Sequence, residues 1–297
     1  MYSKIQNTST IGKTLPAVIF CCYLAVLLSW PVNVDANQEL FDKLQAKLIK
    51  DGLSKKRVQA LYQNPKVIFE IRGVTLFFMH NEATLNYDQF KKKSNISKAR
   101  KYMQRYKAEL AMAEKRFQVG PEVITAIMLV ETRLGKYVGK RSIINTLSTL
   151  ATLSDPVARD YLWKHIPESR RFSKQQFNKK AVKKSKWAYR ELKAFLKYTA
   201  GQKMDPVKIK GSHAGAMGLS QFMPTNILIF AKDGNKDGRL DLFTHADAIM
   251  SIASYLEHYG WKPGLPKEKA GKVIYHYNHS KYYVNTVLDI VRILELK

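Results

Sequence analysis

The stretch that decides the fold reads Pro121-Glu-Val-Ile-Thr-Ala-Ile-Met-Leu-Val-Glu131-Thr-Arg-Leu-Gly135. Gly120 precedes it, and Pro121 takes the first position of the predicted helix, where proline is well tolerated. An apolar stripe with helical spacing runs along it, formed by Ile124, Ile127, Met128 and Leu134. The segment is therefore predicted to be a core helix that ends at Gly135.

Glu131 falls inside this apolar stripe, four residues after Ile127 and three after Met128. No neighbour at helical spacing can pair with a carboxylate, and Arg133, two positions on, points elsewhere on a helix. Apolar surroundings favour the neutral form of a carboxyl group, and a glutamic acid protonated near neutral pH can act as a general acid. The alternative is a glutamate that reaches a distant arginine or a buried backbone amide, and the helix alone favours neither.

The composition bounds the class of protein. The chain has 297 residues, of which 45% are hydrophobic and 25% charged, which excludes a disordered or fibrous protein. Lys and Arg number 50 against 24 acidic residues, a formal net charge of +26. This balance predicts a polyanionic partner or surface: nucleic acid, anionic lipid or an acidic cell-wall glycan.

Residues 1–36 are predicted to be a secretory signal peptide. Basic residues precede an apolar run at 17–28, and Ala36 offers a small residue for cleavage. Both cysteines, Cys21 and Cys22, lie in that run, so the exported chain would hold neither a disulfide nor a thiolate. The run is short for a membrane span, although an anchor that stays attached is the alternative.

Helical periodicity continues along most of the chain and strand signals are sparse, so the fold class is predicted as mainly α. The expected helical segments include 39–50, 97–117, 121–135, 226–231, 246–259 and 284–294. Residues 37–118 are interpreted as an N-terminal helical region and residues 119–297 as the core. Residues 70–87 are apolar without a clear period and stay unassigned.

Basic residues dominate 164–190, where Phe172, Phe177, Trp187 and Tyr189 interleave with them. This pattern is typical of nucleic-acid binding. The favoured interpretation is a solvated helix face with aromatics turned inward, because an exported protein rarely meets nucleic acid as its ligand. Nucleic acid is therefore not expected as a partner.

A glycine-rich loop, GSHAGAMGLSQFMP, runs from Gly211 to Pro224. Glycines let the backbone approach a ligand or a neighbouring element closely, and their spacing here is not that of a phosphate or dinucleotide loop. Ser212 and Gln221 could hydrogen-bond sugar hydroxyls, and Phe222 could pack against a pyranose ring. From these residues alone, a tightly packed loop without a ligand is the favoured interpretation.

Residues 233–247 contain an EF-hand-like loop. Positions 1, 3, 5 and 6 of the calcium-binding pattern are matched by Asp233, Asn235, Asp237 and Gly238. Thr244 stands where a closing glutamate is usual, and Asp247 could replace it. We expect one structural Ca²⁺ site, and a polar Asp-Gly turn is the alternative.

Five motifs occur in one order: Val130-Glu-Thr-Arg-Leu-Gly135, Gly211-Ser-His-Ala-Gly-Ala-Met-Gly218, Gln221-Phe-Met-Pro224, Asp233 to Asp241, and Tyr277-Asn278-His-Ser280. With them the sequence resembles the membrane-bound lytic murein transglycosylase B family, densely between about Val119 and Leu288. The resemblance implies a lysozyme-like helical core with peptidoglycan as substrate. It also implies cleavage of the MurNAc–GlcNAc β-1,4 bond without hydrolysis, which leaves a 1,6-anhydro sugar.

The resemblance further implies roles for particular residues. Glu131 would be the single catalytic acid/base. Saccharide contacts would come from Ser212, Gln221, Phe222, Tyr255, Tyr277, Asn278 and Tyr283. The calcium ligands would be Asp233, Asn235, Asp237, Arg239 and Asp247. No organic cofactor is implied, and the expected location is periplasmic or otherwise extracytoplasmic, as a monomer that could associate peripherally with a membrane.

Two departures from the family pattern stand out. Asp155-Pro156-Val157, with Arg159 displaced, replaces the family's Pro-Arg-Arg, and Leu134 replaces its tryptophan beside the acid. The first departure concerns contacts to the glycan or its stem peptide, and the second concerns the wall around the carboxyl group. Two other functions stay open: a hydrolytic muramidase, which needs a second carboxylate or base near Glu131, and a non-catalytic peptidoglycan-binding protein.

Overall fold

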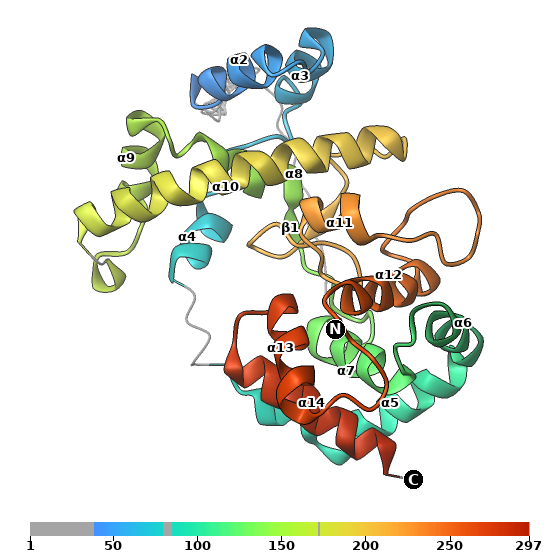
Figure 1. Ribbon diagram of the computed structural model, residues 1–297. Helices are drawn as coiled ribbons and strands as arrows, with labels where there is room; N and C mark the ends of the chain where they lie inside the picture. Colours follow the sequence, from blue (N-terminus) through green and yellow to red (C-terminus); the bar gives the residue numbers. More distant parts are fainter. Residues whose placement is uncertain (1–38, 80–84, 172, 297) are drawn as a thin grey trace, which may run out of the picture. The chain divides into compact units, whose positions relative to one another are not determined.

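The predicted core helix is α7, Pro121–Thr132, and it is buried on nearly all sides. It contacts α5 (Lys93–Arg105), α6 (Lys107–Phe117), α12 (His245–His258) and α14 (Lys281–Glu295). Figure 1 shows this arrangement in the computed structural model, which describes residues 39–79, 85–171 and 173–296. The apolar stripe read from the sequence is thus one side of a helix whose other faces are also covered.

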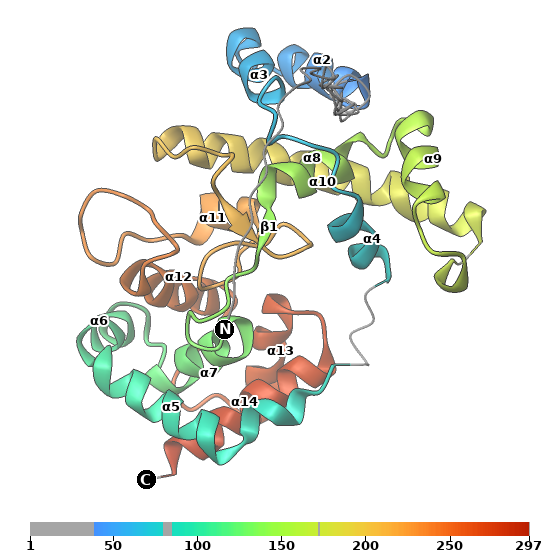
Figure 2. The same ribbon diagram turned by 180° about the vertical axis from the view of Figure 1, so that it is seen from behind.

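A second group of helices is organised by α10, Lys174–Gly201, which runs alongside α8, Ile143–Thr152 (Figures 1 and 2). Also in contact with α10 are α9 (Pro156–Lys164) and α11 (Pro224–Phe230). The face of α8 is covered further by α4 (Ile71–Met79) and α2 (Asp42–Lys50), and α3 (Lys55–Tyr62) packs on α2.

A short antiparallel ribbon holds the glycine-rich loop in place. Its strands are β1, Arg141–Ser142, and β2, Lys210–Gly211, with Arg141 opposite Gly211. Two 3₁₀ turns, η2 (Tyr87–Lys91) and η3 (Glu168–Arg170), and one further helix, α13 (Lys267–Tyr277), which packs on α14, complete the described elements. The mainly α prediction is confirmed.

The structure differs from the sequence prediction at several element boundaries. The helix predicted over 121–135 ends at Thr132, and the segment predicted as one helix over 97–117 is two helices separated at Tyr106, whose φ and ψ are −107° and 31°. The unassigned segment 70–87 contains α4. The division at residue 118 stays a prediction.

The predicted signal peptide, residues 1–36, lies outside the described residues. Within the part of the chain that the structure describes, no helix combines the length and the apolar character that a membrane span requires.

Candidate active site

Glu131 lies half-buried in the last turn of α7, and the chain leaves the helix directly after it. Arg133, Leu134 and Gly135 have φ values of 51°, 62° and 90°. Left-handed backbone cannot continue a right-handed helix, so the three residues end it at Thr132. The expected placement of Leu134 on the helix is therefore wrong.

The end of α7 is tied to the glycine-rich loop through Thr132. The buried Thr132 hydroxyl, as a donor, lies 3.1 Å from the Leu219 carbonyl and 3.3 Å from the Met128 carbonyl of its own helix, and it accepts from the Gly135 N–H at 3.0 Å. Leu219 belongs to the loop that runs from Gly211 to Pro224. The contact therefore holds the last turn of α7, which carries Glu131, in a fixed position relative to that loop.

Glu131 opens into a cavity of about 670 Å³. Its wall is formed by α4, the end of α7, α10, the glycine-rich loop and the end of α13. The lining residues are Phe77, Phe78, Glu131, Lys180, Lys183, Lys184, Ser212, His213, Ala214, Ala216, Gln221, Tyr277 and Asn278. Five of the residues predicted from the sequence thus come together: Glu131, Ser212, Gln221, Tyr277 and Asn278. A concave site with few convergent polar groups is the usual form of a ligand site.

The loop side chains in this cavity are held by backbone contacts. The Ser212 oxygen accepts from the Ala214 and Ala216 N–H groups at 3.2 and 3.0 Å, which leaves its own proton to donate. The Gln221 amide nitrogen donates to the Val138 and Gly218 carbonyls at 3.1 and 2.8 Å, which leaves its oxygen toward other partners.

Close packing also constrains the loop at Gly218. Its φ is +74°, and a Cβ atom there would lie 2.7 Å from the Leu242 carbonyl oxygen. A larger residue would strain the backbone and collide with this neighbour. The close approach predicted for the loop glycines is thus made to a neighbouring element at this position.

Three residues predicted as saccharide contacts do not line the cavity. Phe222, Tyr255 and Tyr283 are only 2%, 3% and 1% exposed. They pack behind Tyr277, whose ring centroid lies 5.7, 5.0 and 6.4 Å from theirs. Aromatic side chains bury large apolar areas, so these residues support the wall from behind, and the structure does not place them in the direct contact that the resemblance implies.

Two tyrosines face the Glu131 carboxylate. Burial first, and then the negative charge of Glu131, raise the pKa values of Tyr277 and Tyr283 well above their usual range. Tyr277 donates to the Ser220 carbonyl. The Tyr283 hydroxyl has no partner of ordinary hydrogen-bond geometry among the described residues, although Glu131 acts on it as an acceptor. Both hydroxyls therefore keep their protons beside the carboxyl group.

The family model described as the transglycosylase SLT domain matches residues 36–270. The chain belongs to this family.

Individual relatives agree with the family assignment. Over 185 residues the chain is 32% identical to the membrane-bound lytic murein transglycosylase B of Escherichia coli (strain K12), covering 62% of this chain. The match spans 44% of that relative, less than half of its length. The structure superposes on the soluble lytic transglycosylase SltB1 of Pseudomonas aeruginosa with a TM-score of 0.69 at 22% identity, over 85% of this chain and 97% of that chain.

A second solved relative carries a metal. The Escherichia coli lytic transglycosylase Slt35 in complex with calcium matches with a TM-score of 0.64 at 24% identity, over 87% of this chain and 92% of that chain. The likeness to both structures confirms the lysozyme-like fold that the sequence predicted.

The sequence reading missed the wall of the site that faces the glycine-rich loop. Phe77 and Phe78 of α4, and Lys180, Lys183 and Lys184 of α10, line the cavity opposite the family motifs. The only sequence signal was the basic segment 164–190 with its aromatics, which was interpreted as a solvated face. Burial, and then the charge of Lys183, lower the pKa of Lys184, whose side chain nevertheless stays exposed at the rim of the cavity.

The sequence departure at residues 155–159 lies away from this cavity. Asp155 accepts from the Val157 N–H at 3.2 Å, caps α9, and forms an ion pair with Lys43 at 2.8 Å. Arg159 donates to the Leu153 and Ser154 carbonyls. These residues connect helices and do not line the cavity.

The oxygen atoms of the EF-hand-like loop converge on its own amides. The Asp237 N–H is shared by the Asp233 and Asn235 side-chain oxygens, at 3.2 Å each, and Gly238 N–H donates to Asp233 at 2.9 Å. Arg239 N–H donates to Asp237 at 2.8 Å. Hard oxygen donors gathered in this way suit Ca²⁺.

Asp247 closes the loop. It is 1% exposed, and its two carboxylate oxygens accept from Gly234 N–H at 2.9 Å and Asp241 N–H at 2.7 Å. Over the described ranges, no three His, Cys, Asp or Glu side chains form a metal-binding group by themselves. A cation here would therefore also need the Asn235 amide oxygen and backbone carbonyls, as EF-hand loops provide.

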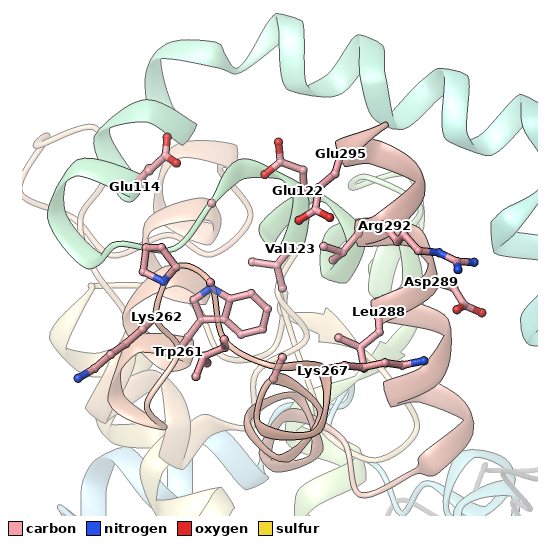
Figure 3. A pocket seen from close by; sticks show the side chains of 16 residues that line it. Glu114, Glu122, Val123, Trp261, Lys262, Lys267, Leu288, Asp289, Arg292 and Glu295 are labelled. Carbon is pink, nitrogen blue, oxygen red and sulfur yellow. The ribbon is translucent and has the colours of Figure 1, made fainter. Parts of the chain in front are cut away.

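A second cavity, of about 500 Å³, lies elsewhere and is shown in Figure 3. Glu114, Glu122, Trp261, Arg292 and Glu295 are among its lining residues. None of the predicted site residues belongs to its wall, so the cavity at Glu131 is the candidate active site.

Proposed function

We propose that the chain is a peptidoglycan lytic transglycosylase that cleaves the MurNAc–GlcNAc β-1,4 bond, with Glu131 as its single general acid/base. One observation carries the proposal: the half-buried Glu131 opens into a cavity that it shares with Ser212, Gln221, Tyr277 and Asn278. Membership of the transglycosylase SLT domain family, and the name of the Escherichia coli relative, support the reaction and the substrate class.

In the first step, protonated Glu131 donates its proton to the glycosidic oxygen. The bond between that oxygen and C1 of MurNAc breaks, and GlcNAc leaves with a 4-hydroxyl group. Positive charge develops at C1, and the Glu131 carboxylate formed in this step is at hand to stabilise it electrostatically.

In the second step, the Glu131 carboxylate takes the proton of the MurNAc 6-hydroxyl. The freed oxygen attacks C1, which closes the 1,6-anhydro ring and restores the acid. A hydroxyl tethered to the same sugar has a high effective concentration, so it outruns water once the cavity is filled. No second carboxylate is needed, in contrast to ordinary glycosidases.

The residues around Glu131 orient the sugar. Ser212 donates from a hydroxyl whose acceptor sites are already used by the loop, and the Asn278 amide, at the end of α13, offers both a donor and an acceptor. Phe222, Tyr255 and Tyr283 act from behind, because they hold the Tyr277 ring in place. Tyr283 keeps its proton and can donate toward the carboxylate that the first step forms, whereas the proton of Tyr277 is already donated to the Ser220 carbonyl.

The EF-hand-like loop would hold one structural Ca²⁺ through Asp233, Asn235, Asp237, the carbonyl group of Arg239, and Asp247. The ion supplies positive charge that stabilises the loop, and α12 begins within this loop at His245. Calcium bound by the solved Slt35 relative supports this assignment.

The protein acts outside the cytoplasm. Residues 1–36 direct export, and the mature chain works on periplasmic glycan strands as a monomer, with peripheral association with the membrane. The substrate proposed here and the name of the membrane-bound relative support this placement.

Digestion of purified sacculi by the wild-type protein and by two variants tests the proposal. We expect Glu131→Gln to release no soluble fragments, while it still binds sacculi and keeps its melting temperature. Glu122→Gln is the matched control, because Glu122 lies on the same helix but outside the cavity at Glu131. Normal cleavage by Glu131→Gln would remove Glu131 from the mechanism.

A further inference from the structure

The middle of α10 presents a row of cations that the proposed mechanism does not use. Lys179, Lys183, Lys186 and Arg190 are exposed and spaced so that they follow one face of the helix. At the rise of an α-helix, eleven residues cover about 16 Å. We call these four residues the α10 stripe.

The α10 stripe is continuous with the candidate active site. A third hollow, of about 590 Å³, lies on α10 and is lined by all four stripe residues together with Val182, Lys184 and Trp187. Lys183 and Lys184 line this hollow and also the cavity at Glu131. A ligand that leaves the cavity along α10 therefore meets the stripe directly.

The cations of the stripe form no ion pair among the described residues, and only Arg190 acts electrostatically on a carboxyl group, that of the neighbouring Glu191. The described ion pairs of α10 lie toward its two ends, Lys174 with Asp160 at 3.0 Å and Lys193 with Asp51 at 2.8 Å. None of the stripe cations pairs with a carboxylate among the described residues, and none of the described residues that line the hollow is acidic. Like charges four residues apart destabilise a helix, so this row costs stability unless an anion occupies it.

The aromatic side chains of α10 argue against single-stranded nucleic acid as the ligand of the stripe. Phe177 and Tyr189 are 0% and 7% exposed. The Trp187 ring is stacked on Phe77 with a centroid distance of 6.0 Å and planes 4° apart. Single-stranded nucleic acid is held by bases stacked on open aromatic faces, and these rings are buried or already stacked on another ring.

No exposed large apolar side chain of the described chain lies on α10, which argues against insertion of this helix into lipid.

We propose that the α10 stripe is an exosite that binds the stem-peptide and free lactyl carboxylate groups of the peptidoglycan strand whose bond lies at Glu131. This inference rests on the proposed function. The strand would enter the cavity, pass Lys183 and Lys184, and be held farther along by Lys179, Lys186 and Arg190. These last three residues line the hollow but not the cavity, so they can be changed without touching the candidate active site.

The test compares two triple variants, each built on Glu131→Gln so that binding is measured without cleavage. The exosite variant is Lys179→Gln, Lys186→Gln, Arg190→Gln. The control is Lys98→Gln, Lys101→Gln, Lys115→Gln, which removes the same charge from exposed positions on α5 and α6. Pelleting measures binding to sacculi and to sacculi whose carboxylates have been converted to neutral amides.

We expect the exosite variant to bind untreated sacculi about tenfold more weakly than the control, equivalent to about 1.4 kcal/mol. On amidated sacculi the two variants should bind alike. Equal binding of the two variants to untreated sacculi, or the same difference on amidated sacculi, would overturn the proposal. The proposal would also be overturned if the protein bound DNA or anionic phosphatidylglycerol vesicles more tightly than sacculi.

A cleavage assay separates this proposal from the proposed function. With Glu131 intact, the exosite triple variant should cleave a short soluble glycan fragment at the wild-type rate, because such a fragment does not reach the stripe. If the wild-type protein cleaves neither sacculi nor the fragment, the proposed function fails, while the pelleting comparison still decides whether the exosite exists.

Discussion

Thr132 is the residue that connects the chemistry of Glu131 to the fold. Its hydroxyl joins the last turn of α7 to the Leu219 carbonyl, so one buried hydrogen bond registers the helix against the glycine-rich loop. Gly135 N–H uses the same oxygen. The position of the carboxyl group therefore depends on a side chain that does not itself line the cavity.

We expect Thr132→Val to lower the free energy of unfolding by about 1–3 kcal/mol, because it leaves the Leu219 carbonyl of a buried residue and the N–H of the half-buried Gly135 without this partner. Sacculus cleavage should slow as well, since Glu131 would no longer be held in position relative to the glycine-rich loop. Thermal unfolding and the cleavage rate measure the two effects.

The matched control is Thr125→Val on the same helix. The Thr125 hydroxyl is buried with no partner among the described residues, so its loss should cost little stability or even raise it. Equal destabilisation by both substitutions would show that the Thr132 contact has no special role.

At the scale of elements, the sequence predicts helices better than it predicts which surfaces meet. The period of 121–135 identifies α7, but helical spacing cannot reveal that Arg133 and Leu134 adopt left-handed backbone, a conformation that non-glycine residues disfavour. The break at Tyr106 is equally invisible, because both flanking segments keep a helical pattern.

One wall of the candidate site could likewise be predicted from the sequence, and the other could not. Local motifs identify the wall made by the glycine-rich loop and the end of α13. Phe222, Tyr255 and Tyr283 lie behind that wall, and a motif does not say which side of it a ring occupies. The opposite wall, from α4 and α10, forms only through tertiary packing on α8.

The EF-hand-like loop gives a prediction of its own. If it holds Ca²⁺ only in the folded state, chelation should lower the melting temperature. Asp237→Ala should lower it too, and the variant should then be insensitive to the chelator. Unfolding scans with and without chelator test this. A wild-type melting temperature that ignores the chelator, together with a silent Asp237→Ala, would remove the calcium site.

At the scale of the whole molecule, buried tyrosines set the behaviour at alkaline pH. Burial raises the pKa values of Tyr62, Tyr255 and Tyr283 above their ordinary value. Their stabilising contribution is fully present below the pKa of an unfolded tyrosine, about 10, and is lost as the pH rises toward the folded pKa. Each such group contributes a slope of about 1.4 kcal/mol per pH unit in that window.

We therefore expect the free energy of unfolding to fall steeply above about pH 10. Tyr283→Phe should make that fall shallower, because it removes one titrating hydroxyl without breaking a hydrogen bond of ordinary geometry. Urea unfolding at a series of alkaline pH values measures the slope. An unchanged slope in the variant would contradict a protonated Tyr283 in the folded protein.

The charge of +26 belongs to the same scale. Much of it is spread over solvated helix faces, where surface charges mainly support solubility and attraction to polyanions. On α10 the basic residues are concentrated beside the candidate active site, where they can orient a bound polyanion. Strands with many carboxylates would be attracted by the whole molecule and aligned by the α10 stripe.

The most direct test of the central claim is the mass of the sugar ends released from purified sacculi. The account predicts 1,6-anhydro-MurNAc ends, each lighter by one water than the product of hydrolysis, and none from Glu131→Gln. Release of reducing MurNAc ends alone by the wild-type protein would contradict it, because water would then have taken the place assigned to the sugar's own hydroxyl.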